Sequence, residues 1–252
     1  MVWRDGPRAM IRTALAVVLL AVPVAAEAQG YACAVPARVP RPRADVPTPD
    51  QPRRVLAIGG YTLAVTWAPQ YCRANAREAA AKFECGSGNR FGFTLHGLWP
   101  DGEGAEWPQY CRPTGIVPPT VVRGQLCATP SAQLIQHEWA KHGTCMSQSP
   151  ADYFAEARRL YARLRYPDMV ALSRRTDLTA RDLASAVAAA NRGVSADMMR
   201  ITANKAGWVE EIWFCLDRQR LPVRCPSHQG GLAADAPIKI WRGPSARSSR
   251  RR

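Results

Sequence analysis

The feature that most constrains this chain of 252 residues is its set of eight cysteines. An even number suits a framework of disulfides, although eight cysteines allow about 105 pairings. No two of them show C-x-x-C spacing, so the sequence indicates neither a zinc ribbon nor a thioredoxin-like motif. We therefore expect structural cross-links. The cysteines are Cys33, Cys72, Cys85, Cys111, Cys127, Cys145, Cys215 and Cys225.

The first 28 residues are typical of a secretory signal peptide. Three arginines precede an apolar run, Thr13 to Ala26, which is too short and too isolated for a membrane span. Glu27 lies between the small residues Ala26 and Ala28, so we expect cleavage before Gln29; a retained anchor helix is the alternative. The processed chain would be secreted or periplasmic, without a membrane anchor, where disulfides form readily.

The chain is strongly basic, with 34 Lys+Arg against 20 Asp+Glu and a net charge of +14. Such a charge favours a polyanionic partner. A hydrophobic content of 47% excludes a disordered polymer. Residues 29–54 are rich in proline and arginine and predict an extended arm. We expect one domain at 55–242, followed by a basic disordered tail at 243–252.

Apolar periodicity predicts strands before and after a group of helices, which indicates an α+β fold. The first helix should stop at Gly143, and Thr179 with Asp182 forms a capping box at the start of the last one. A turn is expected at 204–207, between two late strands. The predicted strands are 61–67, 91–95, 199–203, 208–216 and 238–241, and the predicted helices are 131–142, 151–165 and 179–191.

The segment FTLHGLWPD carries polar and aromatic side chains at the end of a predicted strand. The strand delivers His96 to its end, where Gly97 lets backbone or ligand come close. The ring of Trp99 can stack on a nucleobase, and the carboxylate of Asp101 can accept its exocyclic N–H groups. The alternative is structural, with Trp99 in the core and His96 as a hydrogen-bonded histidine.

A second segment, HEWAKHGTC, begins at His137. On an α-helix with about 100° per residue, Glu138, Lys141 and His142 lie about 100°, 40° and 140° from it. The four polar groups therefore share one face, while Trp139 can pack on the core. The alternative is a solvated face with a Glu–Lys pair. That alternative leaves unexplained why two of the four histidines of the chain lie here.

A zinc site is a further alternative for the same helix. The metalloprotease motif H-E-x-x-H places its histidines at i,i+4. His137 and His142 lie at i,i+5, about 140° apart around an α-helix, which is poor geometry for one ion. We therefore predict acid–base chemistry with no metal and no cofactor.

Together these segments resemble the two signature segments of the ribonuclease T2 family, the Rh/S-type acid endoribonucleases. The first is HGLWP with Asp101, and the second is HEWAKHGTC. The resemblance extends from about Tyr61 to Cys225 and includes WAPQYC and EIWFCLD, leaving out the arm and the tail. It implies a single disulfide-stapled domain of ribonuclease Rh-like α+β fold, with an antiparallel central sheet and packed helices. His228 lies outside both segments and is expected to be exposed.

The resemblance also implies a pairing of the cysteines. A bridge between Cys111 and Cys145 would tie the two signature segments together. Each bridge would stabilise the fold by about 2–4 kcal/mol. The expected pairs are Cys111–Cys145, Cys215–Cys225, Cys72–Cys85 and Cys33–Cys127.

The activity that the resemblance implies is cleavage of single-stranded RNA with broad base preference. The ribose 2′-OH attacks the adjacent phosphorus and expels the 5′-oxygen, leaving a 2′,3′-cyclic phosphate that is later hydrolysed to a 3′-phosphate. DNA lacks this nucleophile. We expect a monomeric RNA endonuclease that needs no metal. The alternative is a catalytically weak basic RNA-binding or toxin-like protein on the same fold.

Residue roles follow from the same resemblance. His142 resembles the general base that takes the 2′-OH proton, and His96 resembles the general acid that protonates the leaving oxygen. Glu138 and Lys141 resemble the pair that stabilises the phosphorane, and His137 resembles the phosphate-binding histidine. The base-binding residues are expected to be Trp99 and Asp101, with Trp107 or Tyr110 as a second aromatic wall.

Overall fold

The computed structural model describes residues 32–86 and 88–243. The predicted signal peptide and almost all of the predicted basic tail lie outside the described residues. The described chain contains an antiparallel sheet in the order β2-β1-β4-β3. Its strands are β1 (Ile58–Trp67), β2 (Phe93–Gly102), β3 (Met199–Ala203) and β4 (Val209–Leu216).

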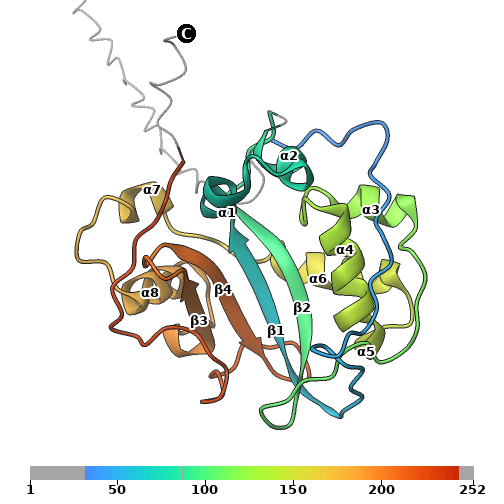
Figure 1. Cartoon of the computed structure of the whole chain (residues 1–252). Helices are drawn as coiled ribbons and strands as arrows, with labels where there is room; N and C mark the ends of the chain where they lie inside the picture. The colour runs from blue at the N-terminus through green and yellow to red at the C-terminus, as the bar shows by residue number, and fades with distance from the viewer. Residues whose placement is uncertain (1–31, 87, 244–252) are drawn as a thin grey trace, which may run out of the picture.

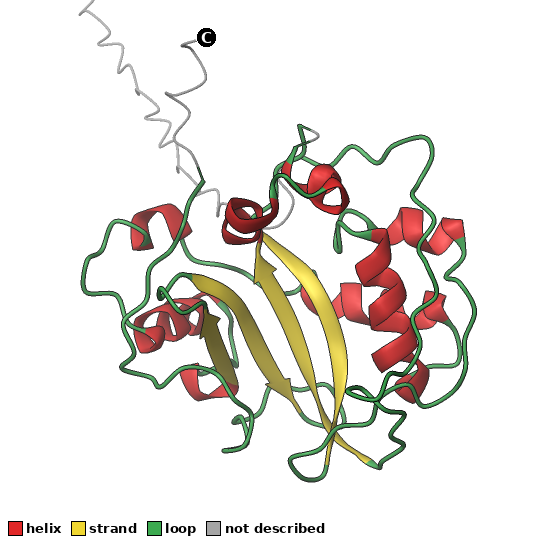
Figure 2. Ribbon diagram, in the orientation of Figure 1, coloured by secondary structure: helices red, strands yellow, loops and turns green. Residues whose placement is uncertain are grey.

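Helices flank this sheet, which confirms the predicted α+β class. In Figure 1, α3 to α6 gather beside β2, and α7 and α8 lie on the side of β3. Figure 2 shows these two groups of helices in red on either side of the yellow strands. No helix in the described ranges is long and apolar enough to cross a membrane. The helices are α1 (Ala68–Asn75), α2 (Lys82–Cys85), α3 (Pro119–Gln125), α4 (Ala132–Glu138), α5 (Thr144–Met146), α6 (Pro150–Tyr161), α7 (Met169–Leu172) and α8 (Ala180–Ala190), with the short turns η1 (Ala79–Ala81), η2 (Trp139–Gly143) and η3 (Ala196–Met198).

The strand β2 is longer than the sequence predicts. Its first residues match the prediction, but it continues past Leu95 to Gly102. The register with β1 passes from Val65↔Leu95 to Ala64↔Gly97, so His96 is an extra residue on β2. Such a β-bulge breaks the apolar alternation on which the prediction depends. The predicted strands at 61–67, 199–203 and 208–216 are confirmed, each within a residue or a few of its observed bounds.

The predicted strand at 238–241 is wrong. Ile238 and Ile240 are buried, as the alternation suggests. However, the segment forms a single parallel bridge, between Lys239 and Trp208. The backbone N–H of Lys239 donates to the carbonyl of Gly207, and its carbonyl accepts the N–H of Val209. Within the described residues these two hydrogen bonds are not continued into a strand.

The helix predicted at 131–142 begins as expected, because the hydroxyl of Ser131 caps α4 and accepts the backbone N–H of Leu134 (3.2 Å). The prediction that it stops at Gly143 is wrong, since the helix continues through η2 into α5. Gly143 has helical dihedral angles (φ −60°). A Cβ there would overlap the indole of Trp139, so the glycine serves close packing rather than helix termination.

Two further helices follow the predictions closely. α6 begins at Pro150 behind the cap of Ser149 and ends at Tyr161, four residues before the predicted end at Arg165. α8 carries the predicted capping box of Thr179 and Asp182. The helices α1 and α3, each with a proline in its first turn, were not predicted.

All four expected disulfides are confirmed. The Cys111–Cys145 bridge joins the segment after β2 to α5, and Cys33–Cys127 joins the start of the arm to the segment that follows α3. No free cysteine is present in the described part of the chain.

The main core lies between the sheet and the helices beside β2. Tyr153 and Phe154 of α6 are buried against β1 and β2, and the Tyr153 hydroxyl donates to the backbone carbonyl of Leu98 (3.0 Å). Trp139 is 3% exposed, which confirms its predicted place in the core. This packing fixes the helical segment 132–146 against β2, and the two signature segments lie on these two elements.

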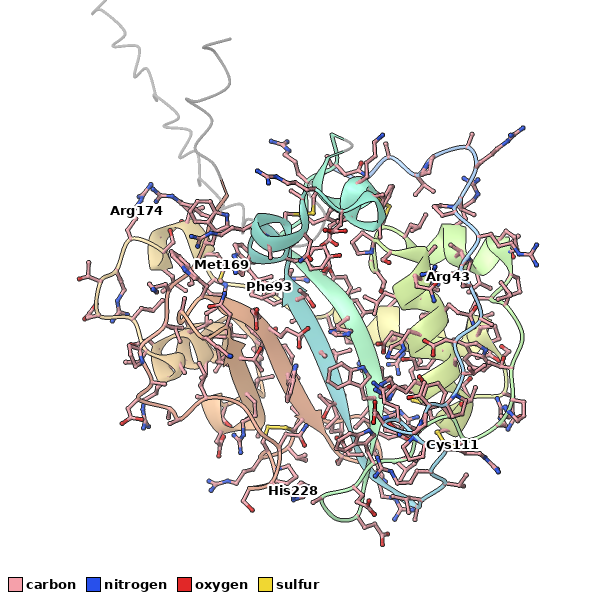
Figure 3. The ribbon with its side chains drawn as sticks, in the orientation of Figure 1. Arg43, Phe93, Cys111, Met169, Arg174 and His228 are labelled. Atoms are coloured by element: carbon pink, nitrogen blue, oxygen red, sulfur yellow. A yellow bond between two sulfur atoms is a disulfide. The ribbon has the colours of Figure 1, made fainter. Side chains whose placement is uncertain are left out.

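The proline- and arginine-rich arm has no helix or multi-residue strand in its described part, residues 32–54, as its composition predicts. It is not detached from the domain: it runs along α3 and α4 as the blue trace of Figure 1. Arg43 is labelled beside α4 in Figure 3. Its backbone N–H donates to the side-chain carbonyl of Gln133, and its backbone carbonyl accepts a hydrogen bond from the side-chain amide of the same residue. Arg54 pairs with Gln109 through two backbone hydrogen bonds (2.9 and 2.8 Å).

Candidate active site

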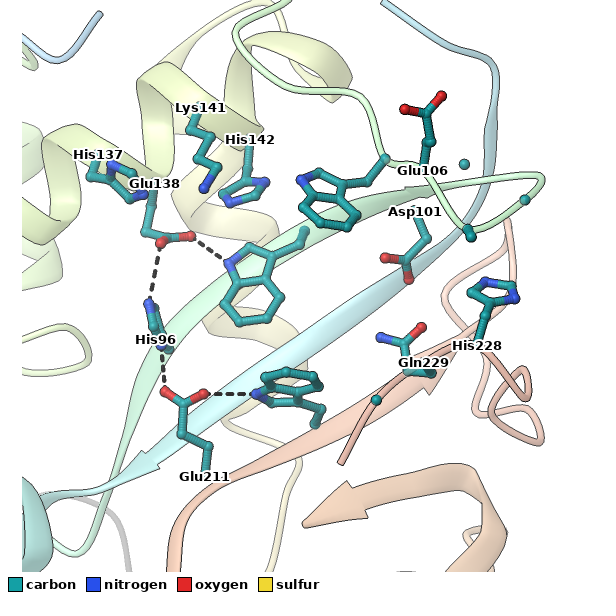
Figure 4. Close-up of a pocket in the computed structure, with 17 residues that line it drawn as sticks. His96, Asp101, Glu106, His137, Glu138, Lys141, His142, Glu211, His228 and Gln229 are labelled. Atoms are coloured by element: carbon teal, nitrogen blue, oxygen red, sulfur yellow. Dashed lines mark hydrogen bonds and ion pairs between the residues drawn. The ribbon is translucent and has the colours of Figure 1, made fainter. Parts of the chain in front are cut away.

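A pocket of about 590 Å³ lies where β2 faces the helical segment 132–146. Every predicted site residue lines it except Tyr110, the alternative to Trp107, so the structure brings both signature segments to one cavity (Figure 4). The predicted residues in its wall are His96, Trp99, Asp101, Trp107, His137, Glu138, Lys141 and His142.

The β-bulge of β2 and the π-helical turn η2 explain how the histidines reach this pocket. His96 is the extra residue of the bulge, and bulges re-aim side chains beside functional sites. On the helix, η2 replaces α-helical hydrogen bonds by i→i+5 bonds, which bring residues five positions apart close together. The ring centroids of His137 and His142 are 6.3 Å apart. The two rings therefore lie close together, although an α-helix would place them about 140° apart around its axis.

His96 lies between two carboxylates. Its Nδ1 is 2.5 Å from Oε1 of Glu211, and its Nε2 is 3.5 Å from Oε1 of Glu138. Glu211 is itself held by N–H and O–H donors from Trp213 (2.7 Å) and Thr66 (2.9 Å). Burial alone would lower the pKa of His96, but the bond to Glu211 and the negative charges of both carboxylates raise it to about 9. The ring is therefore held in its charged form at neutral pH.

His142 has the opposite surroundings. It is 6% exposed, and its Nδ1 has no hydrogen-bond partner among the described residues. Burial, assisted by the positive charges of Lys141, His137 and His96, lowers the pKa of His142 well below 6.5. The ring is therefore neutral at neutral pH and can accept a proton.

Glu138 connects the two sides of the pocket. Its carboxylate accepts the indole N–H of Trp99 (2.8 Å) and faces His96. Burial raises the pKa of Glu138, although His96 and His137 act against the shift. A Cβ on Gly97 would overlap the Glu138 carboxylate, so the group that comes close to this glycine is a side chain of the site itself.

Lys141 is half-buried and lies in the same wall. Burial lowers the pKa of its ammonium group, and the negative charges of Glu138 and Asp45 partly offset this effect. The indole of Trp99 lies among these groups, with its ring centroid 5.0 Å from that of His96 and 5.6 Å from that of His142.

The other end of the pocket contains Asp101 and Trp107. Asp101 accepts the hydroxyl of Thr62 (2.8 Å), and burial raises the pKa of its carboxyl group. Trp107 is 45% exposed in the pocket wall. Tyr110, the other candidate for this wall, is buried outside the pocket.

Four pocket or near-pocket residues received no role from the sequence: Glu211, Trp213, Gln229 and Asp45. Glu211 and Trp213 reach His96 and Trp99 only because β4 lies next to β1. Gln229 donates to Thr62 (2.6 Å) from the loop after Cys225. His228, in the same loop, is exposed as expected, but it lies on the pocket rim. No local pattern in the sequence points to these contacts, apart from the EIWFCLD resemblance that contains Glu211.

One group of side chains in the described part of the chain could hold a metal ion: the ligand atoms of His137, Glu138 and His142 lie within 4.8 Å of one another. This proximity results from η2 and corrects the geometric reason given above against a metal. Oε2 of Glu138 accepts the Trp99 N–H, whereas its Oε1 is buried without a hydrogen-bond partner among the described residues and lies 3.5 Å from Nε2 of His96. The absence of a metal requirement stays a prediction.

An α+β domain with two signature segments on one pocket defines the class, and the comparison with known families agrees. The chain belongs to the Ribonuclease T2 family, whose model matches residues 58–225. It is 30% identical over 119 residues to a "Probable ribonuclease" of Haemophilus influenzae, covering 43% of this chain and 44% of that protein. It is 32% identical over 113 residues to a "Ribonuclease" of Aeromonas hydrophila, covering 45% and 49%. The matches thus span about half the length of these relatives.

The fold is shared with solved structures at low sequence identity. The crystal structure of RNase NT in complex with 5′-AMP superposes with a TM-score of 0.57 at 20% identity. The match covers 73% of this chain and 98% of that one. Over this part of its length the chain therefore has the fold of RNase NT.

Proposed function

We propose that the protein is an endoribonuclease that cleaves single-stranded RNA by acid–base transphosphorylation. The observation that carries the proposal is the pair of imidazoles in one pocket with opposite charge states. His96 has a raised pKa of about 9, and the pKa of His142 is lowered well below 6.5. A general acid must begin protonated and a general base neutral, and both conditions hold between these two values.

In the cleavage step His142 accepts the proton of the ribose 2′-OH as the oxygen attacks phosphorus. His96 donates its proton to the 5′-oxygen as the P–O bond breaks, which leaves a 2′,3′-cyclic phosphate and a free 5′-OH. In the second step the roles reverse: neutral His96 activates water, and charged His142 protonates the 2′-oxygen. The product then carries a 3′-phosphate, and both histidines have returned to their initial states.

The remaining groups of the pocket would bind the phosphate and its developing charge. Lys141 supplies positive charge beside His142, and His137 would contribute the phosphate-binding imidazole in the same wall. Glu138, which faces His96 and lies next to Lys141 in the same wall, would act with Lys141 to stabilise the phosphorane.

Base binding would occur at the other end of the pocket. Trp99 and Trp107 would supply the aromatic walls that stack on a base, and Asp101 would accept the N–H groups of its edge, since aromatic faces and carboxylate acceptors suit unstacked bases. Stacking tolerates every base, which supports a broad preference. The net charge of +14 favours RNA as a polyanion, and the nucleotide complex of RNase NT supports a nucleotide ligand for this fold.

The finer expectations belong to the same proposal. Four disulfides support an oxidising compartment, secreted or periplasmic. We also propose that the protein is a monomer. We further propose that it needs no metal, since every proton transfer above is assigned to a side chain.

The test is cleavage, in the presence of excess EDTA, of a DNA oligonucleotide that contains one ribonucleotide. The products are identified by mass spectrometry. We expect a single cut on the 3′ side of the ribose, with a cyclic phosphate that later becomes a 3′-phosphate. The matched all-DNA oligonucleotide should stay intact. Binding without a cyclic-phosphate product would favour the RNA-binding alternative, and loss of activity in EDTA would contradict the metal-free mechanism.

A further inference from the structure

The arm that precedes the family-matched region brings a carboxylate to the pocket wall. Oδ2 of Asp45 is 2.5 Å from Nδ1 of His137, and its Oδ1 accepts the hydroxyl of Tyr110 (2.9 Å). The Asp45 side chain is 16% exposed and that of His137 is 30% exposed. The family model matches residues 58–225, so Asp45 lies outside it.

The position of Asp45 is fixed on both sides along the arm. Two residues earlier, the backbone N–H of Arg43 donates to Oε1 of Gln133 (2.9 Å) and its carbonyl accepts Nε2 of the same side chain (3.2 Å). Gln133 lies on α4, one turn before His137. Further anchors are the Cys33–Cys127 disulfide at the start of the arm and the Arg54–Gln109 bridge at its end. Asp45 is therefore held by several independent contacts.

The geometry has a direct consequence for His137. A carboxylate accepts a hydrogen bond, so Nδ1 of His137 donates to Asp45, which leaves Nε2 for the pocket. When the ring carries both protons, Nε2 donates to a phosphoryl oxygen. A carboxylate partner of this kind fixes the tautomer and orientation of a functional histidine. Of the charged groups around the ring, Glu138, Lys141 and His142 lie on the same helical segment, and the arm contributes Asp45. The negative charge of Asp45 also acts on Lys141 by raising its pKa against the effect of burial.

We propose that Asp45 is a positioning residue that orients His137 toward the phosphate of the substrate, so that the N-terminal arm is part of the active site. This role rests on the proposed function. The carboxylate acts through His137 and touches no reacting atom, and Tyr110 holds it in place from the opposite side.

The first experiment compares Asp45→Asn with a matched control, Asp50→Asn. Asp50 is exposed in the same arm, near the Thr48–Gln51 turn. Asp45→Asn keeps the shape of the side chain but removes its charge, and we expect kcat/KM for RNA cleavage to fall roughly tenfold to a hundredfold. Asp50→Asn should stay within about twofold of the wild type. Equal activity of wild type and Asp45→Asn would overturn the proposal.

A double-mutant cycle separates positioning from a general loss of structure. If Asp45 acts through His137, adding Asp45→Asn to His137→Ala causes no further loss of kcat/KM. The same loss in both backgrounds would show a merely structural effect and would overturn the proposal.

A third readout does not depend on activity. The ¹⁵N–¹H spectrum of the imidazole rings should show a protonated Nδ1 on His137 in the wild type and a change at this ring in Asp45→Asn. Unchanged ring shifts would overturn the proposal. If the wild type forms no cyclic phosphate, the proposed function fails on its own evidence from the oligonucleotide test, and these shifts still decide whether Asp45 orients His137.

Discussion

The strand that carries His96 and the helical segment that carries His142 depart from regular geometry in comparable ways. In β2 the bulge inserts His96 as an extra residue, and in the helix the π-turn η2 contains His142. Regular versions of either element would point the side chains elsewhere, because one residue shifts a strand side chain to the other face and a helical one by about 100°. Both irregularities therefore serve to aim an imidazole at the same pocket.

The two regions differ in the charges that surround these imidazoles. The strand side supplies Glu211 and, across the pocket, Glu138 faces His96. The helix side surrounds His142 with Lys141 and His137. Identical side chains thus acquire opposite charge states from their neighbours, which is how one pocket can contain both an acid and a base.

The largest effects should come from removing either ring. His96→Ala and His142→Ala should each lower kcat for RNA cleavage about 10²–10⁴-fold, since each removes one proton transfer. The comparison becomes sharper with a substrate whose leaving group needs no proton, the 4-nitrophenyl ester of uridine 3′-phosphate. On this ester His96→Ala should recover most of its activity, whereas His142→Ala should remain impaired.

Initial rates on RNA and on the ester, with thermal unfolding as a check of folding, measure this difference. Equal impairment of both variants on the ester would break the assignment of acid to the strand and base to the helix. Recovery of His142→Ala instead of His96→Ala would reverse the two roles.

A smaller effect is expected from Glu211→Gln. In the wild type, kcat/KM should rise at acid pH as His142 loses its proton. It should fall again as pH passes about 9, because His96 then loses the proton that it must donate. Without the Glu211 charge the pKa of His96 falls, so the descending limb moves to lower pH. At a fixed pH on this limb, kcat/KM should drop about tenfold for every pH unit by which the limb has moved.

The ascending limb provides the internal control, because the groups that lower the pKa of His142 do not include Glu211. The measurement is the pH dependence of kcat/KM for both proteins. A Glu211→Gln profile that keeps its alkaline limb near that of the wild type would contradict the role of Glu211.

The sequence identified much of the pocket but not what aims its side chains. His96 and His142 were found because each lies in a local motif of a few residues. The π-turn was not predicted, because the segment was placed on α-helical geometry and Gly143, taken as the helix end, instead lies close to Trp139 and Tyr153 inside the helical segment. The bulge at His96 likewise depends on the register with β1, which lies about 30 residues earlier in the chain.

The carboxylate partners were missed for a related reason. Glu211 lies 115 positions from His96, and Asp45 lies 92 positions from His137. Local periodicity contains no information about such contacts, because they arise only when β4 pairs with β1 and when the arm folds over α4. The class of fold was predictable because it follows from apolar periodicity and from the family resemblance, and the disulfide pairs were predictable from that resemblance.

The smallest effect concerns stability, where the His96–Glu211 pair should act only within a limited pH window. The raised pKa of His96 stabilises the fold fully below its unfolded value of 6.5, and this contribution is lost as pH rises toward 9. The hydrogen bond to His96 lowers the pKa of Glu211 against the effect of burial. The contribution of Glu211 to stability is therefore present above pH 4.5 and is lost at more acid pH.

The unfolding midpoint of Glu211→Gln should therefore lie furthest below that of the wild type between pH 4.5 and 6.5, and the difference in midpoint should close toward pH 9. For a chain of this size each kcal/mol corresponds to about 2–4 °C, so thermal unfolding across this range can resolve the effect. A gap that stays constant with pH would mean that Glu211 stabilises the fold by packing alone, and the charge on His96 would then need another source.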